Sequence, residues 1–423
     1  MSKKIGEIAY ITKLAGFEHT KYIQGNCTHK KINDDDIPLF IGKTVRDGKI
    51  DTDFDWYISK KISDELPRSK LNKRCIVLPY VGTLGDMAIF ENTYEAHLGS
   101  NIAKIEIEDD SKYSIEFIYY FLKSPYGQNL LMRDLQGAVQ KNITMEAIRN
   151  VILPDIKVEI QNKIVKVLKA MDNKIDNNSK IKSEIENMIR TIFDYWFIQF
   201  EYPNESGNSY KSSGGKMKWN NELKKEIPEG WRYKRIIDIE NDIITGKTPS
   251  TKDETNFGGN IPFITIDDIR KGLYISKTER TLSDKGASSQ IKKYIPKNSI
   301  CVTCIATVGL VGITTKESQT NQQINSIVCK NKYNLYYLVN SIKKYFECSS
   351  GAKSGNIFAN MNKEDFGNIK LIYPTENILE RYTKTVKPMY KKIENCILEN
   401  EKLIKLRDYL LPLLMNGQVG FKD

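Results

Sequence analysis

The chain repeats itself once, and this duplication constrains the fold more than any other feature of the sequence. Residues 37–50 read IPLFIGKTVRDGKI and residues 261–274 read IPFITIDDIRKGLY, an offset of 224. Further along, NITMEAIRNV at 142–151 matches NMNKEDFGNI at 360–369, an offset of 218. Because the echoes keep their order, they indicate a tandem duplication. Each copy spans about 200 residues and can bury a core of its own, so we expect two globular units.

A shorter echo aligns VGTLG at 81–85 with VGLVG at 308–312, an offset of 227. Each motif closes an apolar run that is typical of a buried strand. Such runs come first in each copy, followed by a helical stretch and then by a long terminal helix. They cover residues 37–41, 75–80 and 102–107 in the first copy and 261–266, 300–307 and 325–329 in the second. We therefore predict an α+β chain of two pseudo-repeated α/β domains, each followed by a long helix.

Both terminal helices carry a seam of mostly apolar residues at alternating steps of three and four, the heptad pattern of a coiled coil. The apolar residues are Ile164, Leu168, Met171, Ile175, Ile185, Ile189 and Ile192 in the first helix, and Met389, Ile393, Leu403 and Leu410 in the second. Polar residues interrupt this seam midway, at Asn178 and Lys182 in the first helix and at Asn400 and Arg407 in the second. We expect the helices to pair as an antiparallel coiled coil, a rod of about 50 Å with one unit at each end. An ordinary packed helical hairpin is the alternative. Pro388 predicts a break near the start of the second helix.

These patterns divide the chain into five segments. The first α/β domain covers 1–155, its helix 156–200, the second domain 227–375 and the second helix 376–417. Residues 201–226 are rich in Gly, Ser, Asn and Lys without periodicity, which is typical of a solvated linker.

The formal net charge of +11 indicates a polyanionic partner, although a lysine-rich surface is also common in soluble proteins. Basic residues exceed acidic ones in 228–375, whereas the two nearly balance in 1–155. No stretch approaches the length of a membrane span, so we expect a cytoplasmic protein without membrane contact. Seven cysteines suit a reducing compartment. Cys301 and Cys304 have metal-site spacing, but no second pair accompanies them, so we expect a plain buried strand.

The search for catalytic motifs yields none. The tripeptides at 42–44 and 246–248 read Gly-Lys-Thr, but the glycine that a phosphate loop requires five residues earlier is absent. The glycine-rich cofactor turn and proline-aromatic motif of an amino methyltransferase are also absent. The acidic run 34–36 could hold magnesium, but such runs are more often solvated surface. We therefore expect no catalytic, cofactor-binding or metal site in this chain.

Several motifs together resemble the specificity subunit of type I restriction-modification enzymes, over residues 5–417. They are IPEGW (227–231), TGKTPS (245–250), IPFITIDDI (261–269), NSICVTCIATVGLVG (298–312), TNQQINSI (320–327) and ENEKLIKLRDYLLPLLMNG (399–417). The first half matches less well, with TKLAGF (12–17) in the region of TGKTPS and AHLGSNIAKI (96–105) in the place of TNQQINSI.

The resemblance implies that the α/β domains are target recognition domains, each reading one half of a split, asymmetric site in double-stranded DNA. It also implies that the helices act as a ruler and dock two modification (methyltransferase) subunits, with restriction/translocase subunits completing the enzyme. S-adenosylmethionine, and ATP with Mg, are then expected on those partners and not on this chain.

Long polar side chains near turns are the candidate DNA contacts, because Arg reads guanine bidentately and Lys holds phosphate. They are Lys43, Arg46, Gln140 and Lys141 in the first domain, and Lys247, Thr248, Arg270, Lys271, Lys353 and Ser354 in the second. Two alternatives stay open. One is an enzyme acting on DNA, a nuclease or methyltransferase, with an unrecognised site; the other is a coiled-coil scaffold that does not bind DNA.

Overall fold

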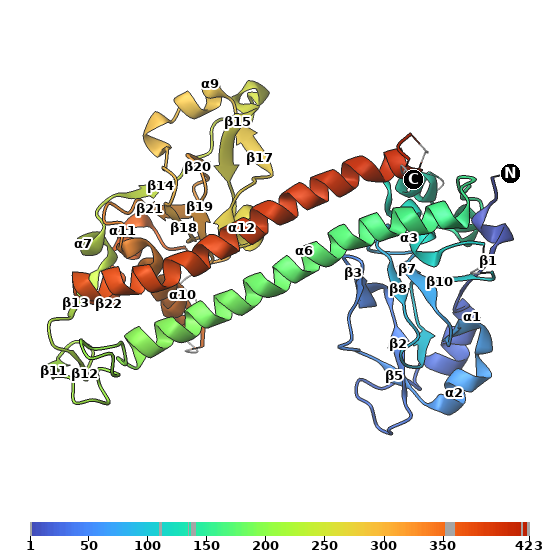
Figure 1. Ribbon diagram of the computed structural model, residues 1–423, viewed down its shortest axis with the longest axis horizontal. Coiled ribbons are helices and arrows are strands. Elements are labelled where there is room, and N and C mark those ends of the chain that lie inside the picture. Colours follow the sequence, from blue (N-terminus) through green and yellow to red (C-terminus); the bar gives the residue numbers. More distant parts are fainter. Residues whose placement is uncertain are drawn as a thin grey trace. The chain divides into compact units, whose positions relative to one another are not determined.

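The computed structural model describes residues 2–109, 112–133, 135–136, 141–351, 360–415 and 418–420 (Figure 1). The chain forms two compact units, of which the first is assembled from two separated segments. Unit 1 comprises residues 1–175 and 402–423, and unit 2 comprises residues 176–401. Each of the two long helices, α6 (Val158–Phe193) and α12 (Glu376–Met415), is therefore divided between the units, with one part in each.

Unit 1 is built on two four-stranded sheets. The first has the order β1-β10-β7-β8 (Ala9–Lys13, Ile102–Ile107, Cys75–Pro79, Ala88–Phe90) and is antiparallel. The second has the order β5-β2-β9-β6 (Tyr57–Ile58, Ile37–Phe40, Ala96–Leu98, Lys70–Leu71), with β2 and β9 parallel. The helices that follow or flank the sheets are α1 (Gly16–Glu18), α2 (Lys60–Glu65), α3 (Ile115–Lys123), α4 (Pro125–Met132) and α5 (Met145–Arg149).

Unit 2 repeats this plan. One sheet has the order β14-β21-β18-β19-β16 (Ile243–Thr245, Ile324–Ile327, Ile300–Thr303, Val311–Thr314, Tyr274–Ile275), and the other has the order β17-β15-β20 (Arg280–Leu282, Phe257–Ile264, Gln319–Thr320). The strand β13 (Arg232–Arg235) pairs with β22 (Lys370–Tyr373). The helices are α7 (Ile236–Ile239), α8 (Ile266–Arg270), α9 (Asp284–Ser288), α10 (Asn334–Gly351) and α11 (Lys363–Gly367).

The two units share their strand pairing, which confirms the pseudo-repeat expected from the sequence. Leu39 pairs with His97 where β2 and β9 run parallel, and Phe263 pairs with Gln319 where β15 and β20 run parallel. Each of the six predicted strand runs overlaps a strand, namely β2, β7, β10, β15, β18 and β21, although the run 300–307 extends well beyond β18. The apolar runs form strands because both faces of these central strands are buried.

Within unit 1, the first part of α6 packs against the last part of α12. Leu168 and Leu411 belong to one buried cluster, and the Arg407 guanidinium donates to Asp172 at 2.8 Å. The hydroxyl of Tyr120 on α3 donates to the same carboxylate at 2.7 Å. The two helix segments therefore run antiparallel in this unit and are tied to the sheet domain.

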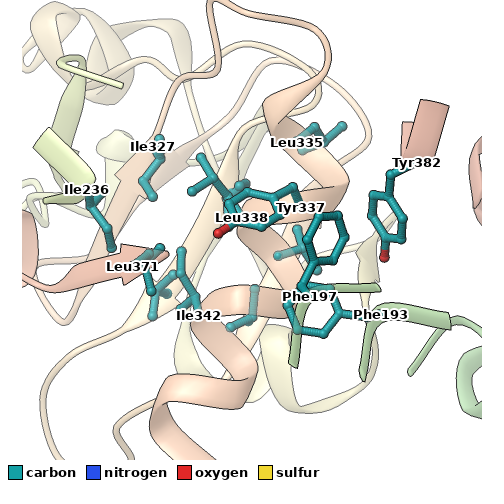
Figure 2. Packing of buried hydrophobic residues seen from close by; sticks show 14 of the residues in the cluster. Phe193, Phe197, Ile236, Ile327, Leu335, Tyr337, Leu338, Ile342, Leu371 and Tyr382 are labelled. Carbon is teal, nitrogen blue, oxygen red and sulfur yellow. The ribbon is translucent and has the colours of Figure 1, made fainter. Parts of the chain in front are cut away.

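Within unit 2, the second part of α6 packs against the first part of α12, again antiparallel. Phe193, Phe197 and Tyr382 gather in one cluster with residues of α10 and the sheet, as Figure 2 shows. The rings of Phe197 and Tyr382 meet edge to face at 4.8 Å. Nearer the middle of α6, the buried Asn178 amide donates to Glu399 and to Asn400 at 2.8 and 2.9 Å.

The structure shields every apolar residue of the predicted heptad seam. Ile164, Leu168, Ile189 and Ile393 are buried, and Met171, Ile175, Ile185, Ile192, Met389, Leu403 and Leu410 are partly buried. The helix α12 runs through Pro388 without interruption, so the predicted break there was wrong. Pro388 is exposed, and water can solvate the carbonyl that loses its helical hydrogen bond.

The segment 201–226 differs from a solvated linker. Its strand β11 (Met217–Asn220) pairs with β12 (Lys225–Pro228) as an antiparallel hairpin. The ring of Tyr202 stacks on Tyr210 at 4.5 Å and on Trp231 at 5.3 Å. A few aromatic side chains thus anchor a stretch whose overall composition is polar.

Candidate nucleic-acid interface

In unit 2, three backbone hydrogen bonds hold together the loops that leave the two sheets. Asn321 donates to the carbonyl of Ile264 at 3.1 Å, and Cys304 donates to Gln323 at 2.8 Å. Met361 in turn donates to the carbonyl of Cys304 at 2.8 Å. We call the segments 245–250, 264–272, 304–309 and 321–323 the loop junction of unit 2. It gathers turns from both sheets, which is the kind of rigidly supported loop cluster that binding sites use.

Unit 1 contains the same junction, formed by segments 40–48, 80–85, 99–101 and 141–143. Gly99 donates to Phe40 at 2.7 Å, and Tyr80 donates to Asn101 at 3.1 Å. Ile143 donates to the carbonyl of Tyr80 at 2.9 Å, as Met361 does to Cys304 in unit 2. Helices α5 and α11 begin just after this last bond, capped by the side chains of Thr144 and Asn362.

The structure of the junctions shows that the sequence echo between 81–85 and 308–312 was aligned in the wrong register. Val81 bridges to Asn142 in unit 1, and Ile305 bridges to Asn360 in unit 2, so the equivalent loops lie 224 residues apart and not 227. Gly85 and Gly309 occupy the same left-handed position, with φ of 88° and 91°. Ala306, with φ 64°, stands where unit 1 has Gly82, with φ 89°. The left-handed turn is retained even where glycine is not.

The four candidate residues of unit 2 that the structure describes all lie at the junction. The Lys247 backbone is fixed at both ends, since its N–H donates to Thr320 at 3.0 Å and its carbonyl accepts from Gln290 at 2.8 Å, while its side chain is exposed. Arg270 at the end of α8 contacts Asp267 at 2.6 Å and donates to the Thr307 hydroxyl at 3.2 Å. The Lys247 loop and the end of α8 therefore each hold an exposed cation in a fixed position.

Lys271 and Thr248 complete this set. The ammonium of Lys271 lies 3.5 Å from Asp268, whose carboxylate already caps α8 by accepting from Thr265. Thr248 donates its hydroxyl to the side-chain carbonyl of Gln322 at 2.6 Å. Sequence reasoning missed Gln322, an exposed amide at the tip of the TNQQ turn, although amides are the side chains that pair with adenine. Its position in a turn between two strands, β20 and β21, was the sequence signal that could have identified it as a candidate contact.

In unit 1 the candidates lie on different local structures. Lys43 is exposed and pairs with Asp55 at 2.7 Å, a surface contact that costs little to exchange for another anion. Arg46 lies in a tight hairpin of β3 (Val45–Arg46) and β4 (Lys49–Ile50), whose turn residues Asp47 and Gly48 both have positive φ. The Arg-x-Gly echo therefore forms a hairpin in unit 1 and a helix end in unit 2.

Lys141 is exposed beside Asn142, next to the junction of unit 1. The remaining candidates, Gln140, Lys353 and Ser354, lie outside the described residues. The two thiols with metal-like spacing are buried in and just after β18, and burial raises the pKa of Cys301 to about 12 and that of Cys304 to about 11. Both are therefore protonated near neutral pH.

The sequence profile of the family described as "Type I restriction modification DNA specificity domain" matches residues 1–187 and 228–405. The chain belongs to this specificity family. The two matched regions correspond to the two copies of the repeat, so this specificity protein carries the family's domain twice.

Two relatives show the same affiliation. The type I restriction enzyme HindI specificity subunit of Haemophilus influenzae is 32% identical over 329 residues, which cover 66% of this chain and 71% of that protein. The MjaIX specificity subunit of Methanocaldococcus jannaschii is 25% identical over 389 residues, 86% of this chain and 82% of that protein.

A solved structure supports the fold. The S subunit of a type I restriction-modification system from M. genitalium aligns with a TM-score of 0.56 at 14% identity, over 100% of this chain and 96% of that one. Among the described residues of this specificity protein, no helix is long and apolar enough to span a membrane.

Proposed function

We propose that this specificity subunit selects the DNA sequence on which a type I restriction-modification enzyme acts, each α/β domain reading one half of a split, asymmetric site. The supporting observation is the pair of loop junctions, which share their backbone hydrogen bonds but differ in the side chains at their rims. Two short words read together discriminate far better than one, because the penalties of mismatched base pairs accumulate.

The chemistry in this proposal belongs to the partners. Two modification subunits supply the S-adenosylmethionine site, and restriction subunits supply the ATP and Mg site. The absence of a glycine-rich cofactor motif from the sequence supports this division. The paired segments of α6 and α12 are the proposed docking surface for the modification subunits.

The test is to combine the purified chain with its candidate modification subunits and to map methylated sites on genomic DNA. In a second complex, residues 228–375 are replaced by the matching domain of a relative, and α6 and α12 are left unchanged. We expect methylation only in the presence of the partners, and a change in one half of the target only. Methyl transfer by the isolated chain, or a change in both halves, would contradict the proposal.

A second experiment tests whether the paired helices set the spacing between the two words. One heptad is inserted after Asn178 and one after Cys396, which preserves the seam and lengthens each helix by about 10 Å. The gap in the methylated site should grow by about three base pairs. An unchanged gap at normal activity would show that these helices are not the ruler. The change also rotates the second word by about 100°, so weaker binding is expected.

A further inference from the structure

A cleft in unit 2 collects positive charge from three separate elements. Its cations are Lys182 and Arg190 of α6, Arg270 and Lys271 at the end of α8, and Lys343 and Lys344 of α10. The carboxylates in the cleft are only Glu186, Asp194 and Glu347. The described lining therefore has a surplus of positive charge.

Two lysines of the cleft take no part in its ion pairs. Lys344 pairs with Asp194 at 3.0 Å, and Arg190 pairs with Glu347 at 2.9 Å. Within the described part of the chain, Lys182 and Lys343 have no carboxylate within 4.0 Å. These two ammonium groups are the ones that a bound anion would neutralise.

The surroundings of both lysines favour such an anion. Lys343 is half-buried, and loss of solvation lowers the pKa of its ammonium, an effect that nearby Glu186 opposes only in part. A partly desolvated cation gains more from an anion than a fully hydrated one. Beside Lys182 lies Gly272, where an added Cβ would come within 4.0 Å of the ammonium nitrogen. The turn at Gly272 therefore lies close to this ammonium group.

The cleft is joined to the loop junction through Arg270. This side chain lines the cleft and also donates to Thr307 of the junction at 3.2 Å. A ligand in the cleft therefore lies beside the loops proposed to read bases. Phosphate contacts of this kind fix the register of a DNA-binding protein without reading the sequence.

We propose that this cleft binds a backbone phosphate of the DNA that flanks the half-site read by unit 2, with Lys182 and Lys343 as its principal ligands. The inference rests on the proposed function and adds a sequence-independent contact to it. It assigns to α6 a role in holding DNA, in addition to its pairing with α12.

The test uses the complex with modification subunits, carrying Lys182→Gln together with Lys343→Met, which keeps the apolar stem of the half-buried lysine. Binding of a target duplex and of a scrambled duplex is measured over a series of salt concentrations. Loss of one phosphate contact should make the slope of log K against log salt shallower by about 0.9. Affinity should fall by the same factor for both duplexes, and the methylated sequence should stay the same.

The matched control is Lys180→Gln. Lys180 is exposed on the same helix and points away from Lys182, because two residues turn an α-helix by about 200°. An unchanged salt slope in the double variant, or an equal change in the control, would overturn the proposal. So would a variant whose only defect is weaker assembly with modification subunits, since the cleft would then hold an acidic protein segment. Failure of the proposed function would instead appear in the unmodified complex, as equal affinity for both duplexes.

Discussion

The loop junctions of units 1 and 2 are built from the same backbone hydrogen bonds and differ in the structure of their rims. Arg46 extends from a hairpin and Arg270 from the end of a helix, although both follow an equivalent strand. Lys43 is paired with Asp55, whereas Lys247 has no ion pair among the described residues. The framework therefore tolerates extensive change in the side chains and turns that it carries, which the proposed reading of two different DNA words requires.

The largest expected effect comes from placing a carboxylate at equivalent buried positions of the two helices. Leu168 of unit 1 and Val386 of unit 2 lie 218 residues apart, and both are fully buried. Leu168→Asp should destabilise unit 1 by several kcal/mol, and Val386→Asp should do the same to unit 2, because an unpaired charge is buried in each. Hydrogen exchange read out peptide by peptide would show which unit opens.

The control variants for this pair are Leu168→Met and Val386→Ile, which keep both positions apolar. If either aspartate variant raised exchange equally in both units, the two units would not be separate cooperative structures.

A second comparison concerns the two lysines of the Gly-Lys-Thr tripeptides. Lys247→Gln should weaken binding of the target duplex by about tenfold, or about 1.4 kcal/mol, because this ammonium is exposed on a fixed backbone. Lys43→Gln should have a smaller effect, since Asp55 already neutralises part of that charge. Titration of the assembled complex with labelled duplex measures both. A larger loss for Lys43→Gln would reverse the assignment of the stronger contact.

A third comparison uses pH, because all three histidines lie in residues 1–175. His97 is fully buried in unit 1, and burial lowers its pKa below the ordinary 6.5, although carbonyls of Leu98 and Leu66 partly offset this. Below pH 6.5 the unfolded chain therefore binds a proton that the folded unit resists, and stability present above that pH is lost as the pH falls.

We expect hydrogen exchange, corrected for its intrinsic pH dependence, to show unit 1 opening more readily at pH 5.5 than at pH 7.5. His97→Gln should remove part of this dependence. The prediction fails if the unsubstituted unit 1 is equally protected at both pH values.

The smallest effect concerns the left-handed turn. Gly82→Ala should cost about 1 kcal/mol through backbone strain alone, since an added Cβ would meet nothing within 4 Å. Ala306→Gly, at the equivalent place in unit 2, should relieve similar strain and leave stability nearly unchanged or slightly higher. Chemical denaturation of each variant measures the difference, and destabilisation by Ala306→Gly beyond that of Gly82→Ala would contradict it.

The sequence predicted the elements better than their contacts. Apolar runs and heptads locate the strands and the long helices because burial imposes those periods locally. The register of the 81–85 echo was wrong because it rested on matching residue types. The bridges of Val81 to Asn142 and of Ile305 to Asn360 set the true register, and no local sequence pattern reveals them. Lys182 is a polar interruption of the seam, and its place in a cleft beside α8 and α10 depends on contacts between segments far apart in the sequence. All of the candidate DNA contacts stay predictions, and Gln140, Lys353 and Ser354 in addition lie outside the described residues.

The discontinuity of unit 1 has a consequence for the order in which this chain becomes stable during synthesis. Leu411, Leu414 and Met415 belong to the same buried cluster as Ile5 and Leu168, yet they are translated about 240 residues after the first segment of that unit ends. At 5 to 20 residues per second this is a delay of roughly 12 to 50 seconds. Until then the nascent N-terminal unit exposes an apolar strip on α6, which makes it a substrate for chaperones and proteases while the ribosome is still at work.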